Sequence, residues 1–81
     1  MGILRVLSRR GDDQIKWDVE RVAVGDPEAT VAINAAERIF REQRARGATA
    51  LVIERDLPPV RIDQFDPSAQ QIVMIPRVVG G

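Results

Sequence analysis

The chain has 81 residues, 44% of them hydrophobic, and its 12 basic and 12 acidic side chains cancel to a formal net charge of zero. That length suits one small domain, and the absence of cysteine and histidine excludes disulfides and Cys/His zinc sites, so apolar packing must hold the fold. The charge balance argues against nucleic-acid binding, and no apolar run approaches the ~20 residues that span a bilayer. We therefore expect a cytoplasmic protein that binds neither nucleic acid nor membranes.

The side chains offer little reactive chemistry. The chain lacks His, Cys and Tyr, which leaves carboxylates, a few hydroxyl groups and Lys16 as the candidates for acid, base or nucleophile. None of these groups has the spacing of a catalytic set, and no acidic stretch has the spacing of a calcium loop. The sequence therefore predicts a protein that is not an enzyme and that has no metal site or cofactor of its own.

The first two elements read as a β-hairpin. Residues 3–9 and 14–19 alternate apolar and polar side chains, and the Gly-Asp-Asp stretch at 11–13 has turn chemistry. The second strand would present three apolar side chains to one face: Ile15, Trp17 and Val19. We expect Trp17 to pack in the core, with an interface role as the alternative. Residues 20–25 either continue this strand or lead into a helix.

A long helix is predicted next. Asp26 is a suitable N-cap and Pro27 suits the first helical position, while Gly47 suits the left-handed residue that follows a helix. Apolar residues recur three or four positions apart and form one stripe: Ala29, Ala32, Ile33, Ala36, Ile39 and Phe40. The helix also carries a row of four arginines: Arg38, Arg41, Arg44 and Arg46. We expect a solvated surface, with a docking face for an acidic partner as the alternative, because two glutamate–arginine pairs have i,i+4 spacing: Glu37 with Arg41, and Glu42 with Arg46.

Three further segments complete the pattern. Residues 48–54 are apolar on both faces, as in a central strand, residues 60–65 alternate, and residues 70–75 form a last strand that Pro76 ends. This order of elements predicts an α+β fold. We expect the first and last strands to lie parallel in the middle of a mixed sheet of four to five strands packed on one main helix, which is the β-grasp.

With this order of elements, the ending IVMIPRVVGG at 72–81 resembles that of the small sulfur carriers, such as the small subunit of molybdopterin synthase. Ubiquitin-like modifiers share the β-grasp fold and the terminal Gly-Gly. The specific motif covers only these ten residues, and Arg77 stands where the sulfur carriers usually have a second proline. The resemblance points to a bacterial or archaeal protein. It divides the chain into a β-grasp domain, 1–75, and a flexible tail, 76–81.

The resemblance implies chemistry at Gly81. An adenylating enzyme would activate the Gly81 carboxylate with ATP, and Gly80 would let the backbone enter a narrow channel. Sulfur would then give a thiocarboxylate, or an enzyme cysteine would pass the chain to a lysine of a target protein, from which a JAB-type isopeptidase would release it. Lys16, the only lysine, would be the candidate acceptor if several copies of the protein were linked into chains. A genome that favours arginine codons would also explain why the sequence has a single lysine.

Partner contacts are expected near the tail and on the sheet face that the helix leaves uncovered. The tail would contribute Arg77, Val78 and Val79. The sheet would contribute Leu51, Ile53, Met74 and also Leu7, provided that each faces away from the helix; both alternation phases are apolar, so the sequence leaves the phase open. The alternative function is a β-grasp binding or structural subunit of a larger complex, in which the tail has no chemical role.

Overall fold

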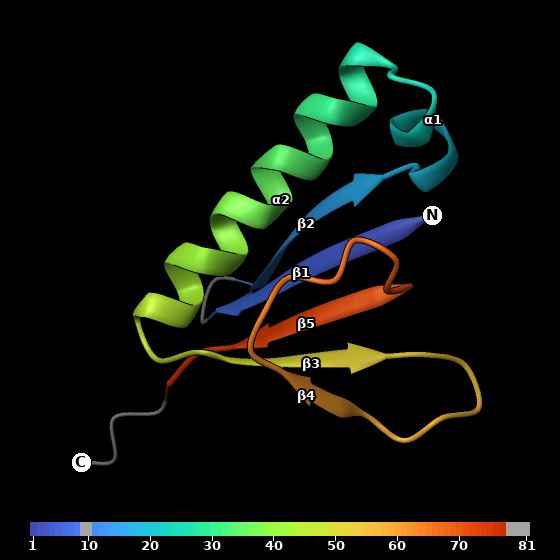
Figure 1. Ribbon diagram of the computed structural model, residues 1–81. Coiled ribbons are helices and arrows are strands. Elements are labelled where there is room, and N and C mark those ends of the chain that lie inside the picture. Colours follow the sequence, from blue (N-terminus) through green and yellow to red (C-terminus); the bar gives the residue numbers. More distant parts are fainter. Residues whose placement is uncertain (9–10, 78–81) are drawn as a thin grey trace.

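The computed structural model describes residues 1–8 and 11–77. The elements of this part of the chain are, in order, β1 (Gly2–Ser8), β2 (Gly11–Trp17), α1 (Val19–Ala23), α2 (Pro27–Ala45), β3 (Thr49–Ile53), β4 (Val60–Ile62) and β5 (Gln71–Ile75). The strands form one mixed sheet in the order β2-β1-β5-β3-β4, in which β1 and β5 are parallel and the other pairs are antiparallel. Figure 1 shows α2 crossing the sheet diagonally.

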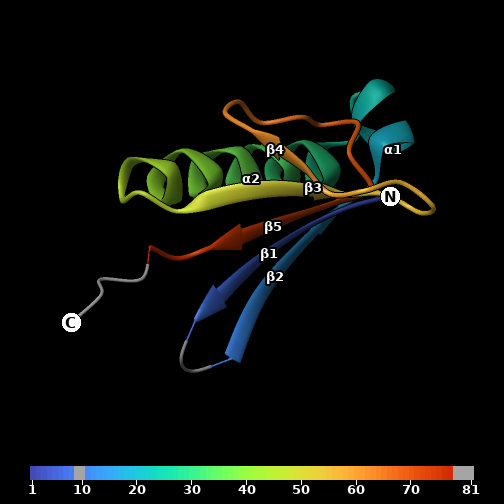
Figure 2. The ribbon, with the colours of Figure 1, turned by 90° about the horizontal axis from the view of Figure 1, so that it is seen from below.

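The helix covers one face of the sheet. Seen from the edge, α2 lies on one side of β1, β5 and β3, and no described helix lies on the opposite side (Figure 2). A central parallel pair, a hairpin at the N-terminus and one main helix define a β-grasp-like α+β fold. The predicted fold class and the parallel placement of the first and last strands are confirmed.

Local signals fix the ends of α2 as predicted. The Asp26 side chain accepts a hydrogen bond from the Ala29 N–H at 3.0 Å, and Pro27 is the first helical residue. At the other end Gly47 adopts a φ of 91°, a left-handed conformation that glycine reaches without strain. The chain then turns directly into β3, and the Ala48 N–H donates to the Gln43 carbonyl at 3.0 Å.

The ambiguous segment before α2 is a short helix, and the prediction that Val19 belongs to the hairpin face was wrong. Asp18 ends the strand, because its side chain accepts hydrogen bonds from the N–H groups of Glu20 and Arg21 at 3.0 and 3.3 Å. This cap offers the backbone helical partners in place of strand partners. Val19 therefore opens α1 and is 38% exposed.

The core lies between the sheet and α2. Its buried residues include the following: Leu4, Trp17, Ala36, Phe40, Ala48, Ala50, Val52, Ala69, Ile72 and Met74. Trp17 is a core residue, as expected; its indole N–H donates to the Pro67 carbonyl at 3.0 Å, and its ring lies 5.4 Å from that of Phe65. A methyl group added at Gly2 would overlap this ring, so the close approach of β1 to Trp17 requires glycine there.

Candidate functional site

The open face of the sheet is formed by the side chains of β1, β3 and β5 that point away from α2. Strand register places Val73 of β5 between Arg5 of β1 and Leu51 of β3, and it places Gln71 between Ile3 and Ile53. The residues that precede and follow these along the strands are the buried ones, so the alternation phase is unambiguous. We define the open face by its apolar members: Ile3, Leu7, Leu51, Ile53, Val73 and Ile75.

The structure removes one residue from the expected partner surface. Met74 is fully buried beneath α2, because it follows the open-face residue Val73 and the strand alternates. We therefore withdraw Met74 as a partner contact. Leu51 and Ile53 are half-buried and meet the condition of facing away from the helix. Their contact with a partner stays a prediction.

Polar side chains of the hairpin flank the open face. The Arg5 guanidinium donates to Asp12 Oδ2 from Nε at 2.9 Å and from Nη2 at 2.6 Å, and Gln14 Nε2 donates to the same oxygen at 3.1 Å. These hydrogen bonds, that of Arg5 first, hold the pKa of Asp12 below the usual value of an aspartate. Lys16, opposite Ile3 in the register, is exposed and chemically accessible.

The described part of the chain end runs past the C-terminal end of α2. Ile75 still pairs with Thr49 of β3, whereas Pro76 has no N–H with which to extend the ladder. Pro76 and Arg77 are exposed. The aliphatic part of Arg77 covers Gly47, and its Cδ lies 3.1 Å from where a Cβ on that glycine would stand. Gly47 thus serves twice, by its conformation and by the space that it leaves for Arg77.

A groove lies beside this chain end. It has a volume of about 460 Å³ and runs between the end of β1, the end of α2 and residues 76–77. The groove is lined by Val6, Leu7, Ser8, Gln43, Arg46, Ala48, Pro76 and Arg77. Sequence reasoning missed it, because nothing local in the sequence indicates that the end of β1 and the residues around Gly47 lie close to Arg77.

The arginines of α2 differ from the predicted solvated row. Glu37 pairs with Arg41 at 3.4 Å, as expected, but Glu42 lies 4.0 Å from Arg38 and not in a pair with Arg46. Arg46 is the C-cap, outside the regular helix, whereas Arg38 lies one turn before Glu42 inside it. Arg44 instead connects the end of α2 to the rest of the domain, because its guanidinium donates to the Ala48 carbonyl at 2.8 Å and to Asp63 Oδ1 at 2.9 Å.

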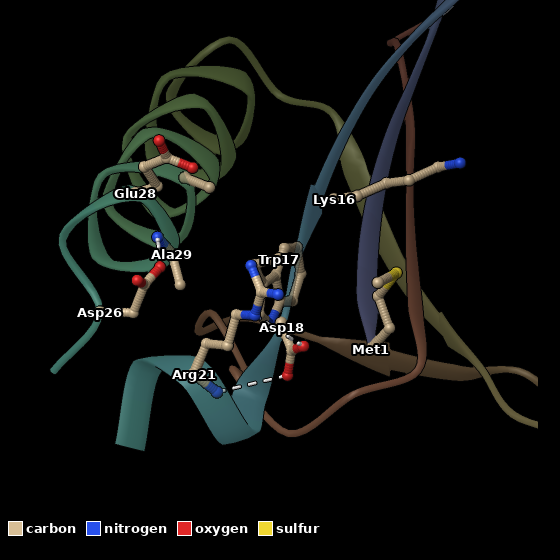
Figure 3. Close-up of a pocket in the computed structure, with 9 residues that line it drawn as sticks. Met1, Lys16, Trp17, Asp18, Arg21, Asp26, Glu28 and Ala29 are labelled. Atoms are coloured by element: carbon tan, nitrogen blue, oxygen red, sulfur yellow. Dashed lines mark hydrogen bonds and ion pairs between the residues drawn. The ribbon is translucent and has the colours of Figure 1, made fainter. Parts of the chain in front are cut away.

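A second pocket, of about 340 Å³, lies at the opposite end of α2 (Figure 3). Two of its three carboxylates already serve the fold, because Asp18 caps α1 and Asp26 caps α2, and the third is that of Glu28 in the first turn of α2. In the view of Figure 3 the Lys16 side chain points away from the helices. Within residues 1–8 and 11–77 no group of three or more acidic side chains is arranged to hold a metal ion.

The remaining predicted site residues, Val78, Val79, Gly80 and Gly81, lie outside the described residues. Comparison with family models, with curated proteins and with solved structures finds no match for this chain. In the described part of the chain, no helix is both long and apolar enough to cross a membrane. The β-grasp-like class thus rests on strand order and helix placement.

Proposed function

We propose that this protein is a ubiquitin-like carrier whose Gly81 carboxylate is activated by an adenylating enzyme. The observation that supports this most directly is the exit of the chain from the central strand β5 past exposed Pro76 and Arg77. A fully extended segment of four residues spans about 13 Å. Residues 78–81 are therefore long enough to carry Gly81 away from the domain into the active site of a docked enzyme.

The proposed chemistry needs no catalytic group from this chain. An oxygen of the Gly81 carboxylate attacks the α-phosphorus of ATP, and pyrophosphate leaves. A sulfur nucleophile then attacks the carbonyl carbon of the acyl-adenylate, and AMP leaves. A persulfide of the partner gives an acyl disulfide, and a second thiol of the partner cleaves its S–S bond, which leaves a thiocarboxylate on Gly81 and a disulfide on the partner. An enzyme cysteine instead gives a thioester, which a target lysine converts to an amide with release of the cysteine. We place these reactions in the cytoplasm and assign the base, the metal and the cysteine to the partner.

The open face is the docking surface in this proposal. Leu51 and Ile53 of β3 and Val73 of β5 present branched apolar side chains to solvent. They lie on a sheet face that no described helix covers (Figure 2). Contiguous exposed apolar patches mark interaction sites in many proteins, which supports the open face as a docking surface. An enzyme bound there would lie beside the end of β5, where Arg77 begins the path toward Gly81.

Adenylation is tested by pyrophosphate exchange. The protein is incubated with a candidate adenylating enzyme from the same organism, ATP and labelled pyrophosphate, and label should enter ATP. Deletion of Gly80 and Gly81 should reduce exchange to background, while Lys16→Arg, which leaves Gly81 intact, should not change it. Undiminished exchange after the deletion would rule out Gly81 as the activated residue.

An intact-mass spectrum of the protein from its native cells separates the branches. Replacement of one oxygen by sulfur on Gly81 identifies a sulfur carrier, and a covalent adduct to a protein identifies a modifier. The apolar open face also suits the second candidate, a binding or structural subunit of a larger complex. In that case the protein without Gly80 and Gly81 should bind its partner with unchanged affinity, and the native mass should show no change at Gly81.

A further inference from the structure

The groove beside Arg77 carries positive charge that the described part of the chain does not neutralise. Arg46 and Arg77 line it, and no aspartate or glutamate does. Within residues 1–8 and 11–77 neither guanidinium has a carboxylate partner. Of the seven other described arginines, five are paired with carboxylates, namely Arg5, Arg21, Arg38, Arg41 and Arg44, and the two unpaired ones, Arg55 and Arg61, lie outside the groove.

Stability of the helix end does not account for these two cations. The hydrogen bonds of Arg44 to the Ala48 carbonyl and to Asp63 already place a cation at the C-terminus of α2. The Gln43 and Arg44 carbonyls also have donors, since the Arg46 and Gly47 N–H groups donate to them at 3.1 and 3.0 Å. The Arg46 side chain is exposed at the groove and makes no hydrogen bond or ion pair with the described residues.

Four further lining residues are apolar: Val6, Leu7, Ala48 and Pro76. A ligand that complements this lining has an apolar side chain with carboxylates close to it. Guanidinium groups bind carboxylates through two parallel N–H···O hydrogen bonds, and these exceed neutral hydrogen bonds in strength.

We propose that this groove binds an acidic peptide segment of a partner protein, in which a leucine-like side chain stands between aspartate or glutamate residues. The apolar side chain contacts Val6 and Pro76, and the flanking carboxylates pair with Arg46 and Arg77. This inference rests on the proposed function and specifies which peptide chemistry its partner would present. The binding of the peptide does not require that Gly81 is activated.

The test is a titration of the ¹⁵N-labelled full chain with a synthetic peptide of alternating glutamate and leucine, followed by NMR. Amide shifts should concentrate in residues 6–8, 43–48 and 77, and the affinity should fall as salt is raised. A peptide with lysine at each glutamate position should not bind. Shifts confined to the open face around Leu51 would overturn the assignment of the groove.

Charge reversal provides the matched comparison. Arg46→Glu and Arg77→Glu should each weaken peptide binding about tenfold or more, which is about 1.4 kcal/mol of binding free energy. Arg55→Glu makes the same charge change on an exposed arginine outside the groove and should leave the affinity within about twofold, a difference below 0.5 kcal/mol. Thermal unfolding of each variant confirms that it is folded. Equal weakening by all three variants would mean nonspecific attraction and would overturn the proposal.

Two further experiments distinguish peptide binding in the groove from activation of Gly81 and from RNA binding. The protein without Gly80 and Gly81 retains every groove residue, so it should bind the peptide normally even though it cannot be activated at Gly81. Loss of pyrophosphate exchange with retained peptide binding thus tests the two proposals independently. A short RNA that competes with the peptide at equal concentration would assign the groove to phosphate groups and would overturn the acidic-peptide proposal.

Discussion

Strands β3 and β5 present two apolar faces that have different roles. On β3 the buried face carries the small residue Ala50, whereas the open face carries the larger Leu51. Three buried alanines let α2 approach the sheet closely: Ala36, Ala48 and Ala50. On β3, the size and hydrophobicity of single residues therefore do not decide which face is covered. The buried face is selected by packing, and the branched residues of the open face remain available for binding.

Truncation of adjacent residues on β5 would test this division with the largest effect. Ile72→Ala removes a fully buried side chain, and we expect a loss of about 2–5 kcal/mol in the free energy of unfolding. Val73→Ala, one residue on and half-buried on the open face, should cost about 1 kcal/mol or less. Urea unfolding followed by circular dichroism measures both. Equal losses would mean that the two faces contribute equally to stability.

A substitution at Gly2 tests how closely the backbone of β1 packs against Trp17 on the buried face. Gly2→Ala adds a methyl group that overlaps the Trp17 ring, so the ring must move from its contact with Phe65 or β1 must shift. We expect a loss of about 1–3 kcal/mol, typical of overpacking, and a changed Trp17 fluorescence maximum. Ile3→Ala, on the open face, is the control and should leave the emission maximum unchanged. An unshifted spectrum in Gly2→Ala would contradict the packing described for Trp17.

Most of the fold could be predicted because its signals are local. Asp26, Pro27 and Gly47 fix the ends of α2 by capping and turn chemistry, which act within a few residues. The strands are recognisable from their alternation, and the parallel pairing of the first and last strands was predicted correctly. The turn predicted at 11–13 was wrong, because these three residues begin β2 and pair with the end of β1. Val19 was assigned wrongly because the pattern of alternation competes there with the capping of α1 by Asp18.

The candidate site was predicted less well because its features depend on contacts between distant residues. Both faces of β5 are apolar and only one of them can pack against α2, so tertiary packing decides that Met74 is buried. The contact between Gly47 and Arg77 joins residues that are far apart in the chain. The pair of Arg44 with Asp63 likewise has no local signal, so the arginines of α2 could not be divided into paired and unpaired groups.

A polar substitution on the open face should affect binding more than folding. Leu51→Gln is expected to lower the free energy of unfolding by about 1 kcal/mol or less, because the residue is only half-buried. In the exchange assay it should raise the KM for this protein without changing kcat, since docking contacts act equally before and during the reaction. Val31→Gln, at a 69% exposed position on α2, is the control and should leave KM unchanged. An unchanged KM in Leu51→Gln would exclude the open face as the docking surface.

The smallest expected effect concerns Asp12 at the margin of the open face. Its pKa is lowered mainly by the hydrogen bonds from Arg5 and then by that from Gln14, so the folded state binds the Asp12 proton less tightly than the unfolded state does. The resulting stabilisation is present above the unfolded-state pKa, about 3.9, and is lost as the pH falls through the lower folded-state pKa. Carboxyl chemical shifts in an NMR titration should give an Asp12 pKa below that of an ordinary aspartate, and Arg5→Gln should raise it. Because Asp12 is exposed, the contribution to stability should also shrink with added salt. An Asp12 pKa that does not change with salt or with Arg5→Gln would contradict this account. It would mean that the hydrogen bonds from Arg5 are not the main cause of the lowered pKa.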